Sequence, residues 1–109
     1  MRSICMPRYH ISRSPGTWEG FVEAPPGTTA GCVAALSEEV VCEARSGGVG
    51  EPLLTEAVTV DGEVFPVGCT LERLAQIIRD CGDEAKLGGR YPGVIPFQAI
   101  ALDQKERQS

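Results

Sequence analysis

Histidine, aromatic side chains and long apolar runs are all scarce in this sequence. Its 109 residues include one histidine, one tryptophan, two tyrosines and three phenylalanines. A serine or cysteine nucleophile needs a base within hydrogen-bond reach, and that base is usually a histidine. The sole histidine, His10, stands near the N-terminus. The composition therefore argues against a catalytic triad and favours a protein that is not an enzyme.

Membrane-spanning and secretory segments are also missing from the sequence. No apolar run approaches the ~20 residues that a transmembrane helix needs. The run Ile4-Cys5-Met6 is too short for the apolar region of a signal peptide. A length of 109 residues matches one domain of common size. We therefore expect a single-domain cytoplasmic protein that does not bind membranes.

Cysteine is present, but not in a metal-binding or disulfide pattern. The five cysteines are Cys5, Cys32, Cys42, Cys69 and Cys81. Their number is odd and no Cys-x-x-Cys pair occurs, whereas structural zinc sites draw paired ligands from close turns and disulfide scaffolds use even numbers. We expect these residues to serve as small apolar side chains, and we expect no metal or other cofactor.

Charge is divided unequally along the chain. Residues 1–16 carry three arginines, one histidine and no acid, whereas residues 17–109 carry seven basic and 15 acidic side chains, a net of −8. A body this acidic repels phosphate backbones, so we do not expect it to bind nucleic acid. We interpret residues 1–16 as a flexible basic arm, residues 17–102 as the folded domain and residues 103–109 as a charged tail.

A hairpin followed by a helix is the clearest structural signal. Asp61-Gly62 separates two valine-rich runs, and this pair favours a type I′ turn because both central residues need positive φ. We expect strands on either side of it, over residues 55–60 and 63–67. Thr70 then suits an N-cap, apolar side chains recur every three or four residues, and a glycine follows. This pattern predicts a helix over residues 70–81.

The remaining elements are two strands and a segment with two interpretations. Residues 17–23 indicate a strand that ends before a Pro-Pro-Gly turn. Between residues 30 and 44 apolar side chains recur with helical spacing, and we favour a helix there. The same segment also fits two strands, 32–36 and 40–44. Residues 94–102 return as a strand.

The order strand, helix, strand, strand, helix, strand predicts an α+β domain. Two strand–helix–strand halves joined by a hairpin form a ferredoxin-like sandwich, in which one antiparallel sheet has both helices on one face. The run from Val60 to Leu74 also resembles the opening of β-grasp, ubiquitin-like domains. If residues 30–44 are two strands, this resemblance implies a mostly β domain with one helix.

An aromatic side chain on the uncovered face of such a sheet is the leading candidate for function. Trp18 and Phe21 are separated by an odd number of positions, so they point to opposite faces of a strand, and at least one of them should lie on that face. We predict a non-catalytic domain that contacts a protein partner, or a second copy of itself, through this face. Trp18 or Phe21 would line the contact together with Val58, Val60, Phe65 or Phe97.

Two other interpretations stay open. Gly27-Thr28-Thr29 stands between a strand and a helix, where helix N-termini bind anions. Arg90 and Tyr91 place a cation beside an aromatic ring in a loop predicted over residues 88–93, which we interpret as a recognition site. The turn and the loop together would form a small-molecule or anion-binding regulatory module.

Cys69 stands at the start of a helix, where N–H groups favour a thiolate, and indicates a thiol-dependent activity.

Overall fold

The computed structural model describes residues 17–25, 27–90 and 93–100 of the chain. These residues form an α+β domain, as the order of elements in the sequence predicts. The elements are β1 (Thr17–Glu23), α1 (Ala30–Ser46), β2 (Leu53–Leu54), β3 (Val58–Val60), β4 (Glu63–Phe65), α2 (Leu71–Cys81), β5 (Leu87–Gly89) and β6 (Val94–Ile100). The predicted arm at residues 1–16 and the predicted tail at residues 103–109 lie outside the described residues.

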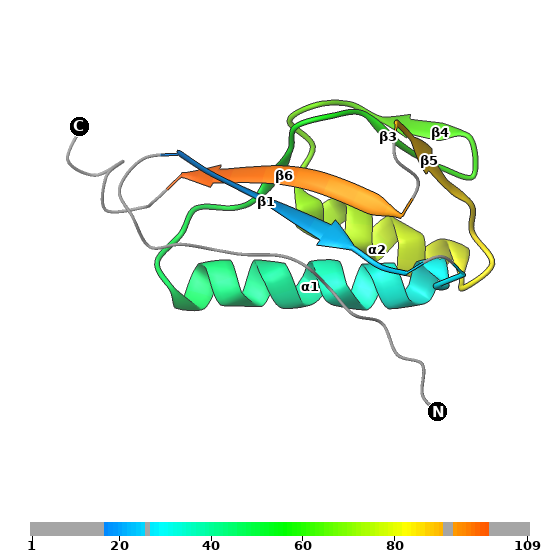
Figure 1. Cartoon of the computed structure of the whole chain (residues 1–109), viewed down its shortest axis with the longest axis horizontal. Coiled ribbons are helices and arrows are strands. Elements are labelled where there is room, and N and C mark those ends of the chain that lie inside the picture. Colours follow the sequence, from blue (N-terminus) through cyan, green and yellow to red (C-terminus); the bar gives the residue numbers. More distant parts are fainter. Residues whose placement is uncertain (1–16, 26, 91–92, 101–109) are drawn as a thin grey trace.

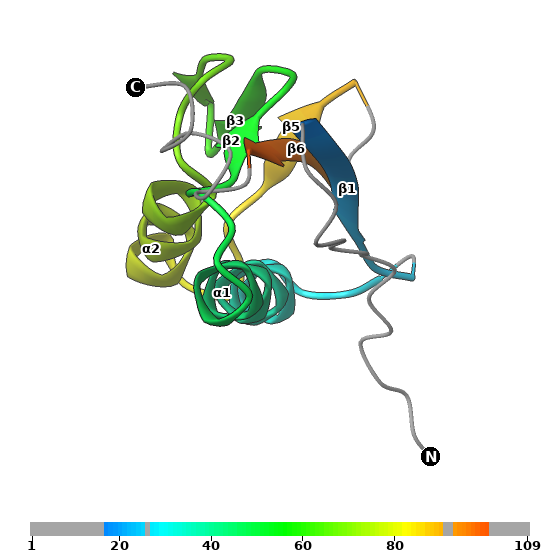
Figure 2. The ribbon, with the colours of Figure 1, turned by 90° about the vertical axis from the view of Figure 1, so that its left-hand side faces the viewer.

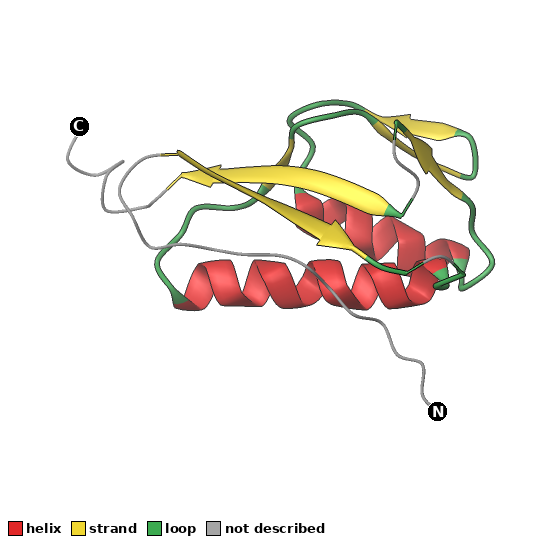
Figure 3. Ribbon diagram, viewed as in Figure 1, coloured by secondary structure: helices red, strands yellow, loops and turns green. Residues whose placement is uncertain are grey.

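The helices lie in one layer and the strands in another (Figures 1 and 3). Seen from the end, α1 and α2 lie side by side beneath the strands (Figure 2). The two helices run antiparallel. Arg79 near the end of α2 pairs with Glu38 at the middle of α1, and Arg45 near the end of α1 pairs with Glu72 at the start of α2. Of the two sides of the strand layer, only one is covered by a described helix.

Residues 30–46 form one helix, which confirms the prediction of a helix in this part of the chain. The Thr29 Oγ1 caps its start by accepting a hydrogen bond of 3.2 Å from the Cys32 N–H. The alanines, leucine and glutamates of the segment favour a helix more than its valines oppose one. The alternative of two strands here, and with it the mostly β domain, is wrong.

β3 and β4 form the predicted hairpin around Asp61 and Gly62. Both central residues have positive φ, 52° at Asp61 and 87° at Gly62, as a type I′ turn requires. The strands pair antiparallel, with Val58 opposite Phe65. A turn signal in the local sequence was therefore enough to locate this hairpin.

α2 matches its prediction at both ends. The Thr70 Oγ1 accepts a hydrogen bond of 3.1 Å from the Arg73 N–H. Gly82 follows the last helical residue with a φ of 95°, a conformation that favours glycine. The buried residues of the helix are Leu71, Leu74, Ala75 and Ile78. This narrow apolar stripe is what the sequence spacing predicts.

The strands form two sheets, whereas a ferredoxin-like sandwich has one. In the first sheet β6 lies between β1 and β2, and in the second β3 lies between β4 and β5. Every pair of neighbouring strands is antiparallel. The predicted single sheet therefore differs from the structure, while the predicted placement of both helices on one side agrees with it (Figure 2).

β2 and β5 are the strands that the sequence did not indicate. β5 contains Gly88 and Gly89, which we expected in a loop. A Cβ on Gly88 would lie 2.3 Å from the Thr59 Oγ1, so glycine at this position leaves room for the Thr59 side chain opposite it. β2 is two residues long, which is too short to show an alternating pattern.

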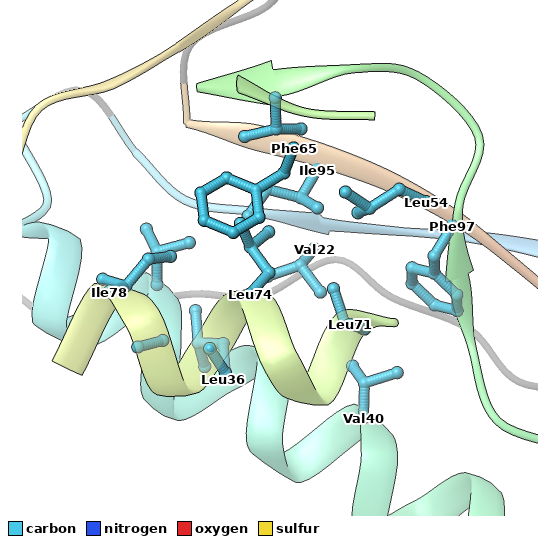
Figure 4. Close-up of a cluster of buried hydrophobic side chains, with 14 of the residues drawn as sticks. Val22, Leu36, Val40, Leu54, Phe65, Leu71, Leu74, Ile78, Ile95 and Phe97 are labelled. Carbon is cyan, nitrogen blue, oxygen red and sulfur yellow. The ribbon is translucent and has the colours of Figure 1, made fainter. Parts of the chain in front are cut away.

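One apolar core joins both sheets to both helices (Figure 4). It receives side chains from every layer, among them Val22 from β1, Leu54 from β2, Val40 from α1, Phe65 from β4 and Leu74 from α2. Alternate residues of a strand point to opposite faces of its sheet. Each strand that contributes to the core therefore also presents side chains to the side away from the helices.

A candidate contact surface on the first sheet

The side of the first sheet that faces away from the helices carries exposed apolar side chains. Along β6 burial alternates from residue to residue, as expected for a strand with the core on one side. Phe21 on β1 is 48% exposed, Leu53 on β2 is 39% exposed and Ile100 on β6 is 48% exposed. We call this outward side of β1, β6 and β2 the open face.

The strand register joins these side chains into one band. Phe21 lies directly opposite Pro96, and Leu53 lies opposite Gln98. Leu53 is therefore a diagonal neighbour of both Pro96 and Ile100, and diagonal neighbours on one face lie roughly 7–8 Å apart. An apolar band thus crosses all three strands of the sheet. Its members are Ile100, Leu53, Pro96 and Phe21.

Two carboxylates border the apolar band on β1. Glu19 and Glu23 stand two residues before and two residues after Phe21, so all three side chains project from the same face. Neither carboxylate takes part in any of the ion pairs formed between described residues. The open face therefore combines an apolar band, in which Gln98 stands between Pro96 and Ile100 on β6, with two carboxylates on β1.

Four residues predicted for the open face lie in the core instead. Phe97 is 3% exposed, and Val58, Val60 and Phe65 are buried as well. Alternation along a strand tells which residues share a face, but not which of the two faces meets the helices. The structure corrects the prediction on this point and removes these four residues from the contact surface.

Phe21 is the predicted contact residue that the structure places on the open face. Sequence reasoning missed Pro96, which lies opposite Phe21, and the other members of the band, Leu53 and Ile100. Their positions depend on which strands pair and in which register. The backbone of Trp18 belongs to β1, but its side chain lies outside what the structure describes.

The predicted recognition loop at Arg90 and Tyr91 is described in part. The Arg90 Nη1 lies 3.6 Å from the Glu56 Oε2, which links the guanidinium to the segment between β2 and β3. Tyr91 lies outside the described residues. The described part of the loop therefore offers a cation that already neighbours a carboxylate.

Gly27-Thr28-Thr29 leads into α1 as predicted, but its hydroxyl groups already have partners. The Thr28 N–H and Oγ1 both donate to the Pro25 carbonyl oxygen, at 3.2 and 2.7 Å, and the Thr29 Oγ1 accepts the capping hydrogen bond. A hollow of about 400 Å³ opens beside the turn. Its described lining is Ala24, Pro25, Gly27, Thr28, Ala30, Val33, Ala85, Leu87 and Gly93. This lining is largely apolar and includes no cation to balance a bound anion.

A carboxylate of the chain already lies against the first turn of α1. A Cβ on Gly31 would lie 1.8 Å from the Asp83 Oδ1, so glycine at this position makes room for the Asp83 side chain. Negative charge is favourable near a helix N-terminus, and Asp83 supplies it. An external anion at this turn would meet the charge of Asp83, which weighs against the predicted anion site.

Cys69 packs partly buried against the core. Two of the N–H donors in the first turn of the adjacent helix have protein partners. The Leu71 N–H donates to the Pro52 carbonyl oxygen at 3.0 Å, and the Arg73 N–H donates to the Thr70 Oγ1 at 3.1 Å. These N–H groups are the ones that would stabilise a thiolate. The geometry favours a packing role for Cys69 at the junction of strand and helix.

Ion pairs connect the outer surfaces of the two helices. The Arg79 guanidinium donates two hydrogen bonds of 2.7 and 2.8 Å to the Glu38 carboxylate, and this bonding raises the pKa of Arg79 above its usual value. Arg45 pairs with Glu72 and also lies 3.8 Å from Glu51. At one end of the contact α1 supplies the arginine and α2 the glutamate, and at the other end these roles are exchanged. Sliding one helix along the other would therefore separate the charges of both ion pairs. They therefore favour one alignment of the helices.

Other kinds of site find no support in the part of the chain that the structure describes. No three His, Cys, Asp or Glu side chains in that part are placed to hold a metal ion. Neither of its helices is both long enough and apolar enough to cross a membrane. No protein-family model matches this chain, and no curated protein or solved structure matches it either.

Proposed function

We propose that this chain is a small non-catalytic interaction domain that contacts a protein partner through its open face. The observation that supports this proposal is the apolar band, which lies on the side of the sheet away from both helices and has Phe21 at one end. Exposed apolar patches rimmed by polar residues are typical of interaction surfaces. The Glu19 and Glu23 carboxylates give this patch such a rim.

Phe21 is the expected anchor of the contact. Aromatic side chains bury much apolar area and are enriched among the few residues that carry most of the energy of an interface. About half of the Phe21 side chain is still accessible to solvent, so a partner that covers it removes that area from water. Its neighbour Pro96 is rigid, so it loses little conformational entropy when it is covered.

Catalysis has weaker support than binding. The thiol of Cys69 packs against the core, and helix donors beside it have partners within the chain. The described hollow beside Gly27 and Thr28 is lined mainly by apolar groups. A contact surface uses the side chains that the fold leaves exposed, and it needs no further group.

The proposal is tested with Phe21→Ser and with Val64→Ser as a matched control. Val64 is 61% exposed on β4 of the second sheet, so both changes replace an exposed apolar side chain. Proteins captured from source cells by each variant are compared, and each protein lost with Phe21→Ser is purified and titrated. We expect Phe21→Ser to weaken binding about 30-fold, the equivalent of ~2 kcal/mol, and Val64→Ser to leave it unchanged. Equal binding by both variants and the original chain would contradict the proposal.

Light scattering over a wide concentration range separates a second copy from a different partner. A mass that doubles with concentration, and stays monomeric in Phe21→Ser, assigns the open face to a symmetric dimer. A monomer at every concentration excludes the symmetric dimer, and the partner must then be a different protein.

A further inference from the structure

β1 has an edge that the other described strands leave unpaired. It stands at the end of the strand order β1-β6-β2, and it pairs with β6 at every position from Thr17 to Glu23 without a bulge. Natural proteins usually protect edge strands with charged side chains, above all lysine, or with proline, bulges or very short length. β1 has seven residues and contains no lysine, arginine or proline, so its only charges are the two glutamates. Its unpaired backbone groups are therefore suited to pairing with another strand.

The other described edges are shorter or covered. β4 has three residues and is followed by Pro66, and β5 has three residues of which two are glycine. The outer side of β2 is occupied by the segment before α2. There the Leu54 N–H donates to the Cys69 carbonyl oxygen at 2.8 Å, and the Gly68 N–H donates to the Leu54 carbonyl oxygen at 2.9 Å. Among the strands described, β1 has the longest edge that no other described segment covers, and the charges on it are all negative.

The charge beside this edge has one sign. Glu19 and Glu23 project from β1 on either side of Phe21. Residues 17–100 carry five basic and 13 acidic side chains, a net of −8. Three of those five cations, Arg45, Arg79 and Arg90, already neighbour carboxylates of the domain. A segment that adds to β1 thus meets a negative field that the described residues do not balance.

We propose that the edge of β1 binds an extended segment of the partner that carries two basic residues four positions apart with an apolar residue midway between them. This inference rests on the proposed function and deepens it by naming what the partner presents. In an antiparallel pair, the two cations lie opposite Glu23 and Glu19 and the apolar residue lies opposite Phe21. Backbone hydrogen bonds to β1 supply affinity, and the alternating side chains supply selectivity.

A cationic segment fits this edge better than a second copy of β1. When β1 pairs with itself about Phe21, Glu19 of each copy faces Glu23 of the other, and like charges directly opposite each other are destabilising. Residues 1–16 of the chain itself, with three arginines and no acid, are the competing occupant. The experiment below separates them from a partner.

The test titrates the full chain with fluorescently labelled Thr-Arg-Val-Phe-Val-Arg-Thr, and with the same peptide carrying Glu in place of Arg. The double variant Glu19→Gln/Glu23→Gln removes the charge beside the edge. Its matched control is Glu43→Gln/Glu84→Gln, which makes the same change in net charge at exposed positions away from the sheet. Anisotropy at low and at moderate salt reports binding.

We expect the Arg peptide to bind and the Glu peptide not to bind. The Glu19→Gln/Glu23→Gln variant should bind the Arg peptide at least tenfold more weakly, the control variant should bind within twofold of the original chain, and salt should weaken binding. Equal weakening in both variants would overturn the inference, because the attraction would then be to net charge and not to the edge. Equal binding of the two peptides would overturn it too.

The remaining outcomes separate this inference from the proposed function. Loss of a partner with Phe21→Ser, together with no binding of the Arg peptide, leaves the proposed function standing and overturns the inference. Binding of the peptide at β1, together with a partner that is unaffected by Phe21→Ser, overturns the proposed contact through Phe21 and also the assignment of the β1 edge to that partner. The triple variant Arg2→Gln/Arg8→Gln/Arg13→Gln removes the positive charge of the three arginines in residues 1–16. If only this variant binds the peptide, the chain's own basic segment occupies the β1 edge, and the assignment of that edge to a partner is overturned.

Discussion

The two faces of the first sheet use alternate residues of the same strands for different purposes. Val22 on β1 and Phe97 on β6 are buried against the helices, whereas their chain neighbours Phe21 and Pro96 turn to the open face. The inner residues hold the fold together through contacts with both helices (Figure 4). The outer residues add little to the fold and are available for binding. Stability and recognition should therefore respond to substitutions at different positions.

The largest expected difference between the faces concerns their two phenylalanines. Phe97→Ala leaves a cavity in the core and should lower the free energy of unfolding by about 3–5 kcal/mol. Phe21→Ala removes a half-exposed ring and should lower it by about 1 kcal/mol or less. Urea unfolding of both variants measures the difference. Equal destabilisation would show that the open face is covered within the monomer.

A smaller difference in stability between an inner and an outer position is expected when one methyl group of a valine is exchanged for a hydroxyl. Val22→Thr places a hydroxyl at a fully buried position and should cost about 1–3 kcal/mol if the hydroxyl finds no partner. Val64→Thr makes the same exchange on the outer side of the second sheet and should change the stability by about 0.5 kcal/mol or less. Thermal unfolding of the pair tests whether the distinction between faces extends to both sheets.

The smallest change in the free energy of unfolding is expected when the buried hydroxyl of Ser37 is removed. Its Oγ donates to the Val33 carbonyl oxygen at 3.0 Å, so this polar group has a partner inside the helix. Ser37→Ala loses that hydrogen bond but gains helix propensity. We expect a change of about 0.5 kcal/mol or less in urea unfolding, well below that of Val22→Thr. A cost as large as that of Val22→Thr would contradict this expectation and would mean that the Ser37 hydrogen bond stabilises the fold by more than alanine gains in helix propensity.

The elements that could be predicted from the sequence are those whose signals are local. The type I′ turn at Asp61 and Gly62, the Thr70 cap and the apolar stripe of α2 each depend on residues within a few positions of one another. The sequence of α1 is less decisive about secondary structure, because its valines fit a strand as well as a helix. Its cap at Thr29 and its length settle the matter in the structure.

The features that could not be predicted depend on pairing between distant segments. The position of β6 between β1 and β2 brings together residues from opposite ends of the domain. That pairing places Pro96 opposite Phe21, brings Leu53 and Ile100 onto the same face of the sheet and sends Phe97 inward. The prediction of a loop at Gly88 fails for a related reason, since the absence of a side chain there leaves room for Thr59 on the paired strand and does not mark a turn.

The most direct test of this account is to map where a cationic strand contacts the full chain. Backbone amide resonances are followed by NMR during titration with Thr-Arg-Val-Phe-Val-Arg-Thr. We expect the largest shifts at Thr17–Glu23 and at the β6 residues that pair with it, with little change along α1 and α2. Shifts confined to the helices, or spread evenly over the acidic surface, would contradict the claim that the open face and its β1 edge form the contact surface.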